Sequence, residues 1–166
     1  MIKHLRLVFC TLLIVGLTAP AVAQDNACKA KQYRQFDFWL GTWAVLSNGK
    51  PAGTNVIKKT LNGCVLEENY DTGTGYRGTS YSMYDFNTDL WHQTWVDNSG
   101  MLLVLDGGFD DGSMVLEGVT VDDKGDVYDN RISWTPQDDG TVRQLWQARK
   151  DDGEWTVIFD GLYRKK

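Results

Sequence analysis

The stretch that decides the fold runs from residue 111 to residue 153 and reads DGSMVLEGVTVDDKGDVYDNRISWTPQDDGTVRQLWQARKDDG. Glycines at positions 112, 125, 140 and 153 divide it at intervals of 13, 15 and 13 residues, and three of them follow an aspartate. An aspartate before a glycine that tolerates positive φ favours a tight hairpin turn. Short strand-like runs separated by such regular turns indicate an antiparallel meander.

Short apolar or alternating runs separated by glycine, aspartate and asparagine also recur closer to the amino terminus. No segment after residue 36 shows sustained helical periodicity. An open meander would leave two unpaired edges, which closure into a barrel removes. We therefore predict an all-β protein, an antiparallel up-and-down barrel of about ten strands, with a short helical turn at residues 32–40 that plugs one end. The predicted strands are residues 42–48, 53–61, 64–72, 77–86, 89–97, 101–108, 113–121, 127–135, 141–149 and 154–164.

The first 23 residues have the features of a secretory signal peptide. Lys3 and Arg6 precede an apolar run at residues 7–17, and residues 21–23 (AVA) form a small-x-small cleavage site. The apolar run is shorter than the roughly 20 residues of a membrane-spanning helix. We therefore predict that residues 1–23 are removed, and that residues 24–166 form one barrel domain in the periplasm or outside the cell, with no membrane insertion.

This predicted domain is acidic and holds two cysteines. It carries 15 basic and 22 acidic residues, a net charge of −7, and an acidic protein repels nucleic acid. An even cysteine count in an oxidising compartment favours a disulfide between Cys28 and Cys64. Two free thiols or a metal pair are the alternatives, but His92 is the only histidine of the domain, and we assign no metal.

The beginning of the domain carries a family resemblance. Residues 36–43 read FDFWLGTW, and a Gly-x-Trp step that begins the first strand resembles the signature of the lipocalins and other calycins. In that superfamily the tryptophan packs across the closed end of the barrel, under a basic side chain from the last strand. The resemblance implies that Gly41 and Trp43 mark the closed end and that Arg164 covers Trp43 through a cation–π contact.

Four further segments extend the resemblance over nearly the whole domain: LNGC at 61–64, WHQTWVD at 91–97, RISW at 131–134 and FDGLY at 159–163. Together they resemble a family of bacterial secreted lipocalin-like proteins of unknown function, which implies a fold but no activity. A related group of barrels binds haem through a histidine near the end of the chain. This chain has no histidine after His92, and we expect no cofactor.

Side chains that alternate along the predicted strands supply the candidate ligand contacts. Seven tryptophans are an excess for a domain of this size, and their apolar faces suit either a filled barrel or the walls of a ligand cavity. Glutamine and arginine side chains on the same strands would orient a ligand. The ligand-contact residues that we predict are Trp91, Gln93, Trp95, Arg131, Trp134, Gln144, Trp146 and Tyr81.

An inward-pointing Arg131 requires an anion, which is either a ligand or one of Glu67 and Glu68, since alternation sends only one of that pair inward. His92 has no nucleophile and carboxylate near it in the sequence, and we assign no catalytic residue.

We expect an exported barrel that binds a small, partly apolar ligand in a tryptophan-lined lumen. The alternatives are a small enzyme of the cyclase or isomerase type that uses the same lumen, and a non-catalytic interaction module of the envelope. A lumen of more than about 300 Å³ would favour binding. A lumenal carboxylate with a strongly raised pKa would favour catalysis. A filled lumen beside a large exposed apolar patch would favour an interaction surface.

Overall fold

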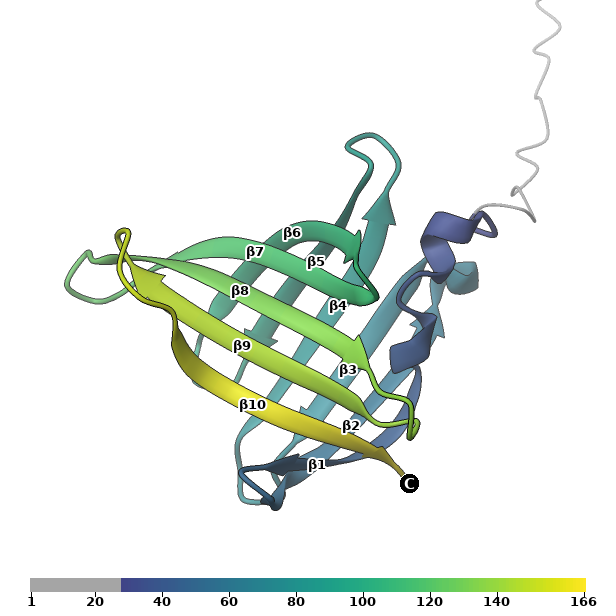
Figure 1. Cartoon of the computed structure of the whole chain (residues 1–166), viewed down its shortest axis with the longest axis horizontal. Coiled ribbons are helices and arrows are strands. Elements are labelled where there is room, and N and C mark those ends of the chain that lie inside the picture. Colours follow the sequence, from purple (N-terminus) through teal and green to yellow (C-terminus); the bar gives the residue numbers. More distant parts are fainter. Residues whose placement is uncertain (1–27) are drawn as a thin grey trace, which may run out of the picture.

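Ten strands follow one another through the part of the chain that the computed structural model describes, residues 28–166 (Figure 1). The strand order around the sheet is β1-β10-β9-β8-β7-β6-β5-β4-β3-β2, and the first and last strands pair antiparallel. Every strand therefore has two neighbours, which leaves no unpaired sheet edge. This confirms the predicted up-and-down barrel; the predicted signal peptide, residues 1–23, lies outside the described residues.

The strand boundaries agree with the predicted ones to within three residues. Gly112, Gly125 and Gly140 adopt positive φ in their turns, as the hairpin pattern requires. In the last hairpin the residue with positive φ is Asp151 (φ 52°) instead of Gly153. The strands are β1 Gly41–Ser47, β2 Lys50–Thr60, β3 Val65–Asp71, β4 Arg77–Asp85, β5 Leu90–Asp97, β6 Leu102–Asp110, β7 Ser113–Val121, β8 Val127–Pro136, β9 Val142–Lys150 and β10 Thr156–Lys165.

Short 3-10 helices cover one end of the barrel, where a helical turn was expected (Figure 1). They are η1 (Lys31–Arg34) and η2 (Asp37–Trp39), while η3 (Leu61–Gly63) connects β2 to β3. The predicted disulfide is present and joins Cys28, just before η1, to Cys64, just after η3. In the chain-entropy model, a bridge that closes a loop of this length stabilises the fold by about 3–4 kcal/mol.

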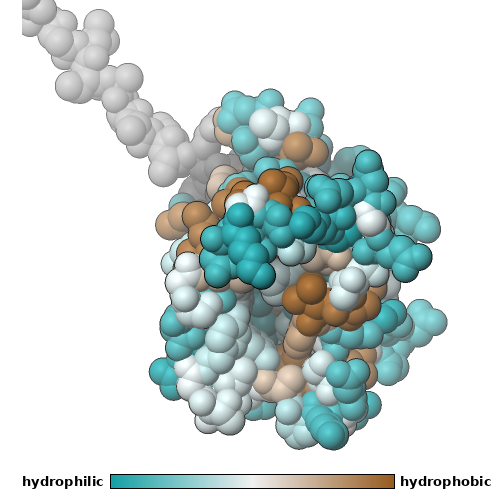
Figure 2. All heavy atoms as spheres, turned by 90° about the vertical axis from the view of Figure 1, so that its left-hand side faces the viewer, coloured by the Kyte–Doolittle hydropathy of each residue, from teal (hydrophilic) through white to brown (hydrophobic). Residues whose placement is uncertain are grey.

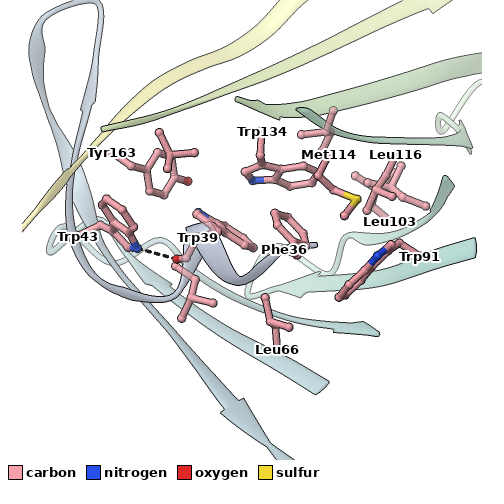
Figure 3. Close-up of a cluster of buried hydrophobic side chains, with 14 of the residues drawn as sticks. Phe36, Trp39, Trp43, Leu66, Trp91, Leu103, Met114, Leu116, Trp134 and Tyr163 are labelled. Atoms are coloured by element: carbon pink, nitrogen blue, oxygen red, sulfur yellow. Dashed lines mark hydrogen bonds between the residues drawn. The ribbon is translucent and has the colours of Figure 1, made fainter. Parts of the chain in front are cut away.

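Aromatic side chains fill the covered end of the barrel (Figure 3). Phe36, which directly precedes η2, and Trp39, the last residue of η2, enter it and stack with their ring centroids 5.0 Å apart. The Phe36 ring meets Trp91 and Trp134 edge-on at 5.7 and 5.2 Å, and all four side chains are buried. Edge-to-face pairs of this kind add to the hydrophobic stabilisation. This half of the barrel is therefore solid.

Lys165, and not Arg164, covers Trp43. Lys165 Nζ lies 4.5 Å from the centroid of the Trp43 ring and donates a hydrogen bond to the Leu40 carbonyl at 2.6 Å. The strand register explains the difference of one residue: Trp43 pairs with Lys165, while Arg164 pairs with Ala44. Directly paired residues share one face of a sheet, so Arg164 points away from the Trp43 ring.

Candidate ligand-binding site

The barrel is hollow at the end opposite to η2. Figure 2 looks onto this end, where apolar residues border a central hollow. The cavity has a volume of about 230 Å³, slightly below the ~300 Å³ at which typical small-molecule sites begin. The cavity does not reach the volume that we expected of a binding lumen, and it has room only for a small ligand. The lining residues are Glu68, Tyr70, Tyr76, Gln93, Trp95, Leu103, Ile132, Gln144, Trp146, Ile158, Phe159 and Tyr163.

Two glycines make room for the aromatic walls of the cavity. A Cβ added to Gly78 would overlap the indole of Trp95, so the absence of a side chain lets the ring lie against β4. In the same way, a Cβ at Gly161 would overlap the ring of Phe159. Substitution of either glycine would push an aromatic ring out of place.

The floor of the cavity is polar and centres on Glu68. Its Oε1 accepts a hydrogen bond from Asn55 Nδ2 at 2.7 Å, and its Oε2 accepts one from Ser80 Oγ at 2.6 Å. Glu68 and Ser80 are directly paired between β3 and β4, which places both side chains on the inner face. Burial raises the pKa of Glu68 from its ordinary value of 4.5 to about 7, although the two hydrogen bonds oppose this. Glu68 therefore exchanges its proton near neutral pH.

A second polar group lies beside this carboxyl. The Tyr163 hydroxyl donates a short hydrogen bond to Gln144 Oε1, and Asn55 Nδ2 lies 3.4 Å from the same hydroxyl. Burial, and then the nearby charge of Glu68, raise the pKa of Tyr163 well above its ordinary value, so the phenol stays neutral. Trp146 is held on the wall above by a 2.9 Å hydrogen bond from its Nε1 to Asn130 Oδ1.

The rim of the cavity carries a fixed negative charge. Tyr76 donates to Asp97 Oδ2 at 2.8 Å, and Trp95 Nε1 lies 3.4 Å from the same oxygen. Burial acts to raise the pKa of Asp97, but hydrogen bonds from Ser99 and Tyr76 outweigh it and bring that pKa down to about 2. Asn98 Nδ2 donates to the Gly75 carbonyl at 2.7 Å and so joins the two loops of the rim.

The predicted ligand contacts separate into three groups. Gln93, Trp95, Gln144 and Trp146 line the cavity. Trp91 and Trp134 point inward but lie in the solid half of the barrel, each 1% exposed. Tyr81 and Arg131 lie on the outer face, away from the cavity.

Alternation along the strands explains the two outward side chains. Ser80 and Ser82 are buried, which leaves Tyr81 on the outer face with 52% exposure. On β8 the buried residues are Asn130, Ile132 and Trp134, so Arg131 points outward.

The prediction of the partner of Arg131 was also wrong. Its Nε lies 2.5 Å from Glu117 Oε1 on the neighbouring strand, and its guanidinium carbon lies 4.6 Å from the centroid of the Trp155 ring. Of the two glutamates considered for this role, Glu68 points inward and Glu67 pairs with Lys58 on the outside. The guanidinium is therefore no anchor for a lumenal ligand.

Sequence reasoning missed Glu68 as a cavity residue in its own right. The signal was the alternation of Leu66, Glu68 and Tyr70 on one face of β3, which continues the inner face of the strand. Tyr76, Phe159 and several other lining side chains were also missed, because the rim forms only when separate hairpins come together.

His92 is part of a hydrogen-bonded set that the sequence did not reveal. Its Nδ1 lies 2.8 Å from Asp106 Oδ1, and its Nε2 lies 2.8 Å from Thr94 Oγ1. Asp106 is the cross-strand partner of His92 on β6, so the two are close in space and 14 residues apart in the chain. The set lies on the outer face of the barrel, away from the lumen.

Within residues 28–166, no three His, Cys, Asp or Glu side chains gather in an arrangement that could hold a metal ion. None of the helices in this part of the chain is long and apolar enough to cross a membrane. A scan against protein-family models and a search of curated proteins find no match to the chain.

Proposed function

We propose that this protein is an exported, lipocalin-like barrel that binds a small, partly apolar molecule in the open half of its lumen. The observation that carries the proposal is the cavity of about 230 Å³, which combines aromatic walls with a hydrogen-bonding floor. The signal-peptide features of residues 1–23 and the Cys28–Cys64 disulfide support export to an oxidising compartment, the periplasm or the exterior.

Desolvation between the faces of Trp95 and Trp146 supplies the driving force. A ligand that buries about 200 Å² of apolar surface gains about 5 kcal/mol from desolvation. Association itself costs at least about 4 kcal/mol in lost translational and rotational freedom. The polar contacts at the floor are therefore needed for useful affinity, and they set the orientation of the ligand.

Native mass spectrometry of the protein purified from its own host tests this proposal. We expect an adduct of small mass on the folded protein, released on denaturation. Trp95→Ala should lower the affinity for that molecule by at least about tenfold, and by more than its loss of stability explains. Trp155→Ala is the matched control, since the Trp155 ring lies outside the barrel against Arg131 and Arg149.

Repeated recovery of the protein with nothing bound would argue against binding, if tryptophan fluorescence also stayed unchanged across a panel of lipids, pigments and sugars. An adduct held with equal affinity by the wild-type protein and Trp95→Ala would place the ligand elsewhere.

Glu68 favours a second candidate, an enzyme of the isomerase or cyclase type. A buried carboxyl with a pKa of about 7 is suited to general acid–base catalysis at neutral pH. Incubation of a small-molecule extract of the host with the protein in D2O tests this candidate. Deuterium that enters a carbon position of one compound with the wild-type protein, and not with Glu68→Gln, would support catalysis. Identical labelling with both proteins would rule out a role of Glu68 in such exchange.

A further inference from the structure

The cavity carries one acidic group and no basic one. Among its lining residues Glu68 is the only Asp or Glu, and none is Lys, Arg or His. Asn55 and Ser80 give this carboxyl two hydrogen bonds but no positive charge. Because a buried carboxylate without a counter-charge is unfavourable, a cation entering the cavity would bind in place of the missing partner.

The Glu68 carboxylate at the floor also has free hydrogen-bond acceptor positions. An ionised carboxylate has about four acceptor positions, and the hydrogen bonds from Asn55 and Ser80 occupy two of them. Asn55, which contacts this carboxyl but does not itself line the cavity, has a buried Oδ1 with no hydrogen-bond partner among the described residues. An ammonium group, with three donors and no acceptor, complements this arrangement.

The walls suit the rest of such a ligand. The cavity exposes the rings of Trp95, Trp146 and Phe159, together with Tyr70 and Tyr76 near the rim. The faces of aromatic rings attract a cation within about 6 Å, and they also pack well against an aromatic or alkyl body. The same residues therefore accommodate both parts of an amine.

The charge of the entrance favours the approach of a cation. Asp97 is ionised at neutral pH, and its carboxylate is held at the rim by Tyr76 and Trp95. The whole chain has a formal net charge of −5. A negative surface potential raises the rate at which positively charged ligands arrive.

From these features we infer that the cavity takes a small organic amine in its cationic form, with the ammonium group on Glu68 and an aromatic or alkyl body between Trp95 and Trp146. This inference rests on the proposed function, binding in the lumen, and it names the chemical class of the ligand.

The pH dependence of binding follows from the state of Glu68. Burial raises its pKa to about 7 in the free protein, and a bound ammonium lowers it again by stabilising the carboxylate. The titratable groups that face it are the phenols of Tyr163 on β10 and Tyr70 on β3, whose pKa values are raised by burial. β2 and β4 contribute Asn55 and Ser80, which do not titrate. Amine binding at neutral pH therefore releases a proton, and the affinity rises from about pH 5 to about pH 8.

Isothermal titration calorimetry with three probes tests the inference. 2-Phenylethylamine, 2-phenylethanol and phenylacetate share one aromatic body and differ in whether they carry an ammonium, a hydroxyl or a carboxylate. Titrations in two buffers of different protonation enthalpy report the protons released. We expect the amine to bind at least about tenfold more tightly than the alcohol, with proton release at neutral pH. Glu68→Gln should weaken amine binding by about 30-fold or more and abolish that release.

Glu67→Gln is the matched control, since it makes the same change at the neighbouring, outward-facing residue and should leave amine binding unchanged. Alcohol or phenylacetate binding as tight as that of the amine, or full amine affinity in Glu68→Gln, would overturn the inference and leave binding in the lumen intact. Wild-type protein that binds the amine without releasing a proton would overturn it too, independently of how the variant folds. Saturable binding of none of the three probes would overturn the inference, while the proposed function is tested separately by native mass spectrometry and the ligand panel.

Discussion

Replacing Glu68 with glutamine should remove a large pH-dependent loss of stability. Between about pH 4.5 and pH 7 the folded protein holds a proton on Glu68 that the unfolded chain has released, because burial raises the pKa of this carboxyl from 4.5 to about 7. The free energy of unfolding therefore falls as the pH rises through this range. Since one pH unit corresponds to about 1.36 kcal/mol, the full loss from this residue is about 3 kcal/mol above neutral pH.

Glutamine keeps the shape and the hydrogen bonds of the protonated side chain. Its carbonyl oxygen can accept from Asn55 Nδ2, and its amide can donate to Ser80 Oγ, whose hydroxyl hydrogen is free to rotate. The free energy of unfolding of the variant, relative to that of the wild-type protein, should therefore rise by about 3 kcal/mol between about pH 4 and about pH 8.

Urea unfolding followed by tryptophan fluorescence, with the disulfide intact, measures this difference at a series of pH values. Glu67→Gln is the control of opposite sign, because hydrogen bonds from Asn69 and Lys58 lower the pKa of Glu67. The stability that Glu67 contributes is present at neutral pH and lost in acid, so its removal should not mimic the loss of Glu68. Parallel pH profiles for the wild-type protein and Glu68→Gln would refute the buried, proton-exchanging carboxyl.

Three further predictions concern the covered end of the barrel, and urea unfolding checks each. Replacing Cys28 and Cys64 with serine should lower the free energy of unfolding by about 3–4 kcal/mol, and unchanged stability would mean that the bridge does not restrain the chain. Trp134→Ala should cost about 3–5 kcal/mol, because the side chain is 1% exposed in the packed core; a loss below 1 kcal/mol would contradict that packing. Lys165→Met should cost about 0.5–1 kcal/mol and Arg164→Met nothing measurable, and the reverse order would restore the sequence-based assignment.

The strands were predictable because the turn chemistry is local. Aspartate and glycine at residues 111–153 mark the hairpins directly, and the observed strands follow the predicted spacing. The largest boundary error, three residues at the start of β2, has the same kind of explanation. Asn48 and Gly49 both adopt positive φ, at 52° and 74°, in a tight Asn-Gly hairpin turn that brings β2 forward to Lys50.

The candidate site was less predictable, because it depends on depth along the barrel. Trp91 and Trp95 share one face of β5, yet only Trp95 reaches the cavity. Phe36 and Trp39 fill the lumen around Trp91, and nothing in the periodicity of β5 shows how far the η2 segment enters. Glu68 was missed as a lumenal residue for a different reason: charged side chains are rarely buried, so an inward glutamate goes against the usual pattern.

The prediction of inward-pointing side chains failed where both faces of a strand carry polar residues. On β8, Arg131 and Ser133 alternate with Asn130, Ile132 and Trp134, so polarity alone did not identify the inner face. The inner face became clear only from burial in the closed barrel.

A high-resolution crystal structure of the protein isolated from its own host tests the central claim most directly. The account predicts extra density for a small molecule between Trp95 and Trp146, in contact with the Glu68 carboxyl. A lumen filled by protein side chains from η2 to the rim, with no space beside Glu68, would contradict it.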